Sequence, residues 1–184
     1  MEVLRVDHLA GIPSAHQEDD KEDKRQALRL VLLLKSESEG LVSEYLRFQG
    51  PPFSTPGFNS TAPVDGLPTP RDLPASLWKR LPLCLSAFTS LAGWFAAVLA
   101  WQKELNPGAV SLHRRLEASQ QQARALCSSL AAILGQPVPG PPAAPAVSRV
   151  IAQKIAGYVA CLSYVNWLTQ TERDLALLVC ETAV

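Results

Sequence analysis

Apolar side chains recur along four stretches of the chain at steps of three, four or seven residues, the spacing of one face of an α-helix. These stretches cover about residues 21–49, 76–105, 110–134 and 148–182. None of them alternates apolar and polar residues as a half-buried strand does. The pattern therefore predicts an all-helical protein with four long helices.

The apolar positions of a helix stripe form the expected core. In the first, third and fourth helices these positions are Ala27, Val31, Leu34, Leu41, Tyr45 and Phe48; Leu112, Leu116, Ala123, Leu126, Leu130 and Ile133; and Ile151, Ile155, Tyr158, Leu162, Val165, Leu168, Leu175 and Leu178. Ser38 interrupts the first stripe, and Gly40 is a weak point that costs ~1 kcal/mol against alanine in a helix.

The lengths of the connections predict the topology. The second and third helices are joined by a few residues around Asn106-Pro107-Gly108, so they are antiparallel neighbours. Residues 135–147 contain five prolines, and as extended polyproline they reach about 40 Å, roughly the length of a 25-residue helix. Residues 50–75 form a still longer connection. Two long crossovers and one short turn predict a long-chain four-helix bundle with up-up-down-down order.

The first crossover keeps two phenylalanines, Phe53 and Phe58, which we expect to fix it to the bundle. Before the first helix, residues 1–20 contain no long apolar run, and we expect them to be flexible and to hold no evident signal peptide. The expected organisation is a flexible segment, residues 1–20, followed by one helical domain, residues 21–184.

Composition narrows the function. The chain of 184 residues is 47% apolar and 18% charged with a formal net charge of zero, which argues against disorder and against nucleic-acid binding. No sequence motif for zinc, nucleotide or nucleophilic chemistry occurs. We therefore expect no enzyme activity, no cofactor and no metal site.

The four cysteines, Cys84, Cys127, Cys161 and Cys180, are widely spaced and each lies in an apolar helical stretch. This favours buried free thiols, with one or two disulfides as the alternative, because sequence alone cannot pair them.

Residues 81–102 carry no charge, with Trp78 just before them and Trp101 near their end. By length and charge they could cross a membrane, so a membrane-anchored helical protein is the alternative function. We favour a buried core helix, because the apolar stripes of the other three helices need a partner.

Three stretches carry a resemblance to known proteins. They are YLRFQGPPFSTPGF at 45–58, KELNPGAVSLHRRLEASQQQARAL at 103–126 and VIAQKIAGYVACLSYVNWLTQTERDLALL at 150–178. In order and spacing, residues 25–180 resemble the cardiotrophin and ciliary neurotrophic factor branch of the interleukin-6 cytokine family.

The resemblance implies a secreted, monomeric cytokine that assembles cell-surface receptors and triggers JAK/STAT-type signalling. It meets membranes only through those receptors. A glycoprotein-130 type receptor would bind exposed faces of the first and third helices, and a leukaemia inhibitory factor receptor type would bind near the start of the fourth. Some members also bind an alpha receptor near the end of the fourth helix. Here Gln170 stands where several members have arginine, and we expect Arg173 and Asp174 to be solvated surface residues.

Within this family a Phe-x-x-Lys pair marks the receptor site of the fourth helix, and the matching residues here are Ile151 and Lys154. Three residues apart, they share a helix face, and an apolar anchor beside a cation suits a small binding hot spot. The alternative is that Ile151 belongs to the core stripe. We expect Lys154 to be an isolated cation in the first two helical turns, where the helix dipole disfavours it by ~0.3–1 kcal/mol.

Overall fold

The computed structural model describes residues 15–140, 142–143 and 145–182, and it contains five helices and no strand within these ranges. The helices are α1 (Ala15–Glu37), α2 (Leu41–Arg47), α3 (Leu77–Leu105), α4 (Val110–Leu134) and α5 (Val150–Glu181). The first crossover loop, residues 48–76, joins α2 to α3, and the second crossover loop, residues 135–149, joins α4 to α5.

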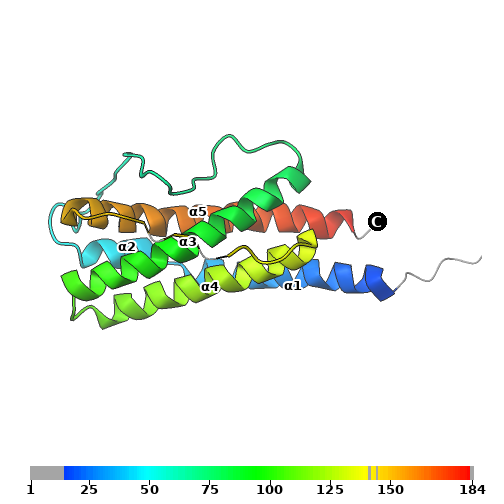
Figure 1. The fold of residues 1–184 in the computed structure, drawn as a ribbon, viewed down its shortest axis with the longest axis horizontal. Helices are drawn as coiled ribbons and strands as arrows, with labels where there is room; N and C mark the ends of the chain where they lie inside the picture. The colour runs from blue at the N-terminus through cyan, green and yellow to red at the C-terminus, as the bar shows by residue number, and fades with distance from the viewer. Residues whose placement is uncertain (1–14, 141, 144, 183–184) are drawn as a thin grey trace, which may run out of the picture.

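The long helices form a four-helix bundle with the predicted up-up-down-down order. In Figure 1, α1 and α3 run in one direction and α4 and α5 in the other. α3 packs on α4 and α5, and α1 packs on the same two helices, so every packed pair is antiparallel. The buried apolar stripes meet in one continuous core.

The first helix differs from its prediction at both ends. It begins at Ala15 rather than near residue 21, because its charged first turns support a helix. Glu18 lies in the first turn, where an acid suits the helix dipole, and Lys24 pairs with Asp20 four residues earlier at 2.6 Å. Residues 1–14 of the segment expected to be flexible lie outside the described residues.

A break at Gly40 divides the predicted first helix into α1 and α2. Gly40 adopts a left-handed conformation with φ of +75°, which other residues rarely enter. The Arg115 guanidinium of α4 donates to the carbonyl oxygens of Glu37 and Glu39 and to the Glu44 carboxylate. Arg115 thereby satisfies groups that the interrupted helix leaves without partners.

The first crossover loop is held along its length, and the expectation that Phe53 and Phe58 fix it is confirmed. Phe53 is buried and Phe58 packs against the core. Further along the loop, the indole nitrogen of Trp94 donates to the carbonyl of Gly66 at 3.2 Å, and that of Trp167 donates to the carbonyl of Pro68 at 3.1 Å. The loop therefore has a defined path along the bundle (Figure 1).

Helix α3 is a core helix in this fold. By length and composition it could cross a membrane, yet it packs on two neighbouring helices and contributes Phe88, Leu91 and Phe95 to the core. The packing supports the interpretation favoured from the sequence.

All four cysteines are free. Cys84, Cys127 and Cys161 are buried as expected, but Cys180 is exposed, because it lies in the last turn of α5, where the neighbouring helices cover less of its surface.

Candidate functional site

At one end of the bundle α2 and α3 end and α5 begins (Figure 1), and buried amide side chains meet there. Gln49 and Gln102 exchange two hydrogen bonds, at 2.9 and 3.0 Å. Asn106 donates to the same Gln102 carbonyl oxygen at 2.9 Å, and Gln102 donates to the Tyr45 hydroxyl at 3.4 Å. Because the partners satisfy one another away from water, this network ties the end of α2 to the end of α3.

Tyr45 also fixes the start of α5. Its hydroxyl donates to the backbone carbonyl oxygen of Lys154 at 2.9 Å. A Cβ atom on Gly157 would lie 2.1 Å from the Tyr45 hydroxyl oxygen, so only glycine allows this close approach. The second turn of α5 is therefore seated directly on the Tyr45 side chain.

Lys154 lies in the second turn of α5, as expected, but the expectation that it is an isolated cation is wrong. Its Nζ donates to the backbone carbonyl oxygen of Gln49 at 2.6 Å. The same Nζ lies 5.8 Å from the ring centroid of Phe53, within cation–π range. The first crossover loop folds back onto α5 and brings these partners to Lys154, a long-range contact that helix periodicity does not reveal.

Ile151 is 66% exposed, so the alternative that it belongs to the core stripe is wrong. Val150 beside it is also exposed, and both line a shallow surface hollow with Ala152 and Ile155. We call these four residues the α5 apolar patch. Exposed aliphatic side chains gathered at one helix end are typical of binding surfaces.

A second exposed surface lies on α1 and α4, which pack on each other. Leu32 and Leu33 of α1 are exposed apolar residues. On α4, Gln121 and Arg124 are exposed, and Arg124 makes no ion pair within the described part of the chain. Leu32 and Leu33 are available to a partner on α1, and Gln121 and Arg124 to a partner on α4, where Arg124 also lines a hollow beside α3.

At the opposite end of the bundle, Arg173 is exposed as expected, but Asp174 is fully buried. The Asp174 carboxylate accepts from Arg80 of α3 at 2.9 Å and from Gln170 at 3.1 Å. Arg80 also donates to the carbonyl of Pro74 at 3.1 Å, so this ion pair anchors the end of the first crossover loop. Asp174 is structural, and the surface expectation for it is wrong because α3 covers it.

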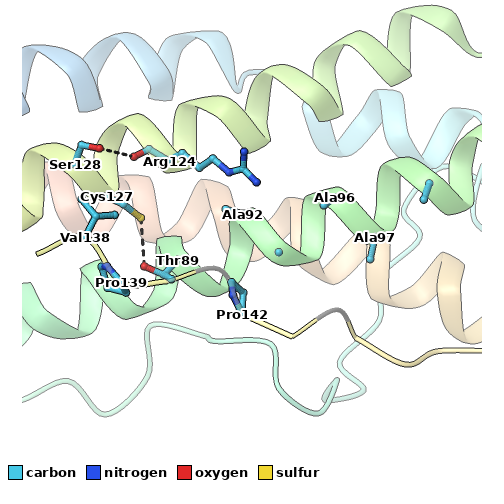
Figure 2. Close-up of a pocket in the computed structure, with 12 residues that line it drawn as sticks. Thr89, Ala92, Ala96, Ala97, Arg124, Cys127, Ser128, Val138, Pro139 and Pro142 are labelled. Atoms are coloured by element: carbon cyan, nitrogen blue, oxygen red, sulfur yellow. Dashed lines mark hydrogen bonds between the residues drawn. The ribbon is translucent and has the colours of Figure 1, made fainter.

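A groove of about 690 Å³ runs between α3 and α4 beneath the second crossover loop. Figure 2 shows Val138, Pro139 and Pro142 of the loop on one side and the small residues Ala92, Ala96 and Ala97 of α3 beside them. The Thr89 Oγ1 and Cys127 Sγ atoms lie 3.4 Å apart within it. The walls are mostly apolar and offer no cluster of reactive groups.

The described residues provide no constellation for catalysis or metal binding. No group of three or more His, Cys, Asp or Glu side chains among them could hold a metal ion. Burial raises the pKa of the Cys84 thiol to about 11 and also raises the pKa values of Cys127 and Cys161. Thiols with raised pKa values are poor nucleophiles at neutral pH.

Sequence reasoning named Ile151 and Lys154 as candidate site residues, but it did not reveal the hydrogen-bond network behind them. Gln102 lies at the end of the uncharged stretch 81–102, and a polar amide in such a run is a weak signal of buried hydrogen bonding. No local signal marks Gln49 as its partner, because the two residues are far apart in the chain.

Comparison with known proteins finds relatives over most of the chain. Cardiotrophin-1 from Homo sapiens is 39% identical over 168 residues, which cover 84% of this chain and 84% of that protein. Cardiotrophin-1 from Rattus norvegicus is 34% identical over 171 residues, with 84% of each chain covered. Cardiotrophin-2 from Mus musculus is 33% identical over 168 residues, with 83% of this chain and 81% of that protein covered. No protein-family model and no solved structure matches.

Proposed function

Because this chain belongs to the cardiotrophin family of interleukin-6-type cytokines, we propose that it acts by joining a glycoprotein-130 type receptor to a leukaemia inhibitory factor receptor type chain. As a family member it is an extracellular cytokine that works by binding receptors and not by catalysis. Bringing two receptor chains together would start JAK/STAT-type signalling in the responding cell.

The α5 apolar patch supports the proposal that the leukaemia inhibitory factor receptor type chain binds at the start of α5. The observation that carries the proposal is the 66% exposure of Ile151, since an apolar anchor must be free in the cytokine before a receptor can cover it. Lys154 lies three residues further along the same face of α5. We assign Ile151 as the receptor contact of this site, with Lys154 beside it on α5.

The outer faces of α1 and α4 suit the glycoprotein-130 type chain. Leu32 and Leu33 supply exposed apolar area on α1, and Arg124 supplies a cation on α4. α4 and α5 lie diagonally across the bundle, and they meet through the Tyr164 hydroxyl, which donates to the Gln122 side chain at 3.1 Å. Two receptor chains could therefore bind different sides of one cytokine monomer.

The test measures binding of the purified chain to the extracellular domain of each receptor, then phosphorylation of receptor tails and STAT proteins in a responsive cell. We expect both domains to bind, and Ile151→Asp to abolish binding to the leukaemia inhibitory factor receptor domain alone. Leu32→Asp and Arg124→Asp together should weaken only the glycoprotein-130 interaction. If the unmodified chain binds neither domain, the proposal is wrong.

A further inference from the structure

We propose that Lys154 is a positioning residue, which holds the start of the first crossover loop against α5 and so shapes the receptor surface beside Ile151, instead of touching the receptor. This inference rests on the proposed function and deepens it. It follows from where the Lys154 ammonium group lies, which the sequence did not indicate.

The ammonium group is already engaged within the chain. It donates to the Gln49 carbonyl oxygen at 2.6 Å and faces the Phe53 ring at 5.8 Å. A charge-assisted hydrogen bond of this length is among the stronger ones in proteins. A receptor carboxylate would have to displace the carbonyl oxygen to pair with Lys154, and the side chain is already partly buried.

Both partners of the ammonium group are themselves fixed. Gln49 is buried, and its side chain exchanges two hydrogen bonds with Gln102. Phe53 is 7% exposed, and its ring centroid lies 5.0 Å from that of Phe58. Lys154 therefore contacts two groups that are themselves held in place. Neither group would move with the Lys154 side chain if that side chain turned toward a receptor.

Tyr158, one helical turn after Lys154, holds the same loop at a second place. Its ring lies 5.4 Å from that of Phe58 in an edge arrangement, and its hydroxyl donates to the Asn59 side chain at 3.4 Å. Lys154 and Tyr158 are four residues apart and share a face of α5. Together they fix residues 49–59 of the loop against the start of α5.

We infer that the loop held in this way borders the α5 apolar patch, because Lys154 lies three residues beyond Ile151 on the same face of α5. Pro51, Pro52 and Ser54 flank Phe53 in the chain and are exposed. If Lys154 releases Phe53, these residues move away from the helix that carries Ile151. The receptor would then meet a surface with the same Ile151 but without a fixed neighbouring loop.

The test combines hydrogen exchange with a double-mutant cycle. Lys154→Met keeps the aliphatic stem but removes the charge, and Phe53→Leu keeps the loop apolar but removes the aromatic ring. Lys79→Met, at an exposed lysine of α3, is the matched control. Backbone hydrogen exchange over residues 50–59 and the affinity for the leukaemia inhibitory factor receptor domain are measured for each variant.

We expect Lys154→Met to speed exchange over residues 50–59 and to weaken receptor binding by about 5- to 30-fold. Phe53→Leu should have similar effects, and the double variant should be no weaker than the weaker single variant. Lys154→Arg, which keeps a cation and donors, should restore most of both properties.

Two results would overturn the inference. One is unchanged exchange over residues 50–59 in Lys154→Met, which would show that Lys154 does not hold the loop. The other is a double variant whose loss of affinity equals the product of the two single-variant losses. Such independence would indicate that Lys154 contacts the receptor directly. If the unmodified chain does not bind the receptor domain, the proposed function fails, while the exchange measurement still decides whether Lys154 fixes the loop.

Discussion

At the residue scale, Ile151 is highly exposed, and the proposed receptor site depends on that exposure. A larger apolar side chain there would not enter the core, because the existing one points into solvent. It would instead offer more area for a receptor to cover, and aromatic residues are enriched among binding hot spots.

We predict that Ile151→Phe strengthens binding to the leukaemia inhibitory factor receptor domain by about 5-fold, equivalent to about 1 kcal/mol, and changes unfolding free energy by less than about 0.5 kcal/mol. Surface plasmon resonance and chemical denaturation measure the two quantities. Leu177→Phe, at an exposed apolar position near the other end of α5, is the control and should leave affinity unchanged. Weaker binding of Ile151→Phe would argue against this residue as the contact.

Gly157 is a second residue with a large expected effect on stability, because it has no side chain where α5 packs on Tyr45. Because a Cβ atom would lie 2.1 Å from the Tyr45 hydroxyl oxygen, we predict that Gly157→Ala destabilises the fold by about 1–3 kcal/mol, as overpacking in a core does. Thermal or urea unfolding measures it. Gly108→Ala, which meets nothing within 4 Å, should stay within about 0.5 kcal/mol of the parent. Equal stability of both variants would contradict the close packing at Gly157.

At the scale of elements, the break between α1 and α2 depends on a side chain from α4. Arg115 bonds to two carbonyl oxygens at the break and to Glu44. We predict that Arg115→Ala lowers the free energy of unfolding by about 2–3 kcal/mol. Hydrogen bonds to charged groups are worth about 1.5–3 kcal/mol, and the substitution leaves the two carbonyl oxygens and the Glu44 carboxylate without these bonds. It should also speed amide exchange around Gly40 and Leu41.

The neighbouring Arg114 provides the matched control. Arg114 is exposed, and its side chain makes no hydrogen bond or ion pair to any described residue. Arg114→Ala should therefore change the free energy of unfolding by less than about 0.5 kcal/mol. A similar loss in both variants would mean that net charge on α4, and not the contact at the break, accounts for the effect.

The same contact predicts a pH dependence. Burial raises the pKa of Glu44, but hydrogen bonds from Arg115 and Ser111 and the charges of Arg115 and Arg47 together hold it below its usual value of 4.5. A depressed folded-state pKa adds stability that is fully present above the unfolded pKa and is lost as pH falls through the folded pKa. The stabilisation from Glu44 is thus complete above pH 4.5 and disappears in more acidic solution.

We predict that Glu44→Gln lowers the melting temperature near neutral pH and that its difference from the parent shrinks as the pH falls below 4.5. Calorimetry across an acid series measures this difference. A gap that stays constant through the acidic range would show that Glu44 is not ionised and stabilised as described.

At the scale of the whole molecule, the packing of α3 on two neighbouring helices favours a core helix over a membrane span. Four-helix packing places Leu91 in the core and leaves Ala96 exposed, although both lie in the uncharged stretch. A membrane-spanning helix would place lipid around most of its surface, and a lysine at its centre would cost about 2.5–3.5 kcal/mol on insertion scales.

We predict that the chain is recovered without detergent as a monomer of 19.9 kDa, and that Ala96→Lys is recovered equally well. Size-exclusion chromatography with light scattering measures the mass. If the unmodified chain is instead recovered in the membrane fraction, and Ala96→Lys abolishes that recovery, the anchored alternative is favoured.

Much of the fold could be predicted from local pattern. The bounds of α3, α4 and α5 fall within two residues of those expected from periodicity and from proline and glycine stops. Loop length predicted the up-up-down-down order because a crossover must span the bundle. The break at Gly40 was visible only as a weak point, since its left-handed conformation is stabilised by Arg115 of a different helix.

The sequence by itself determined the helices, their order and the position of Ile151 at the start of α5, because these depend on residues a few steps apart. Only the tertiary structure decided that Ile151 faces solvent, that Asp174 is buried against Arg80, and that Lys154 turns toward Gln49 and Phe53. Each of these outcomes depends on which distant segment packs against α5, and a helical periodicity of 3.6 residues carries no information about the partner that covers a given face.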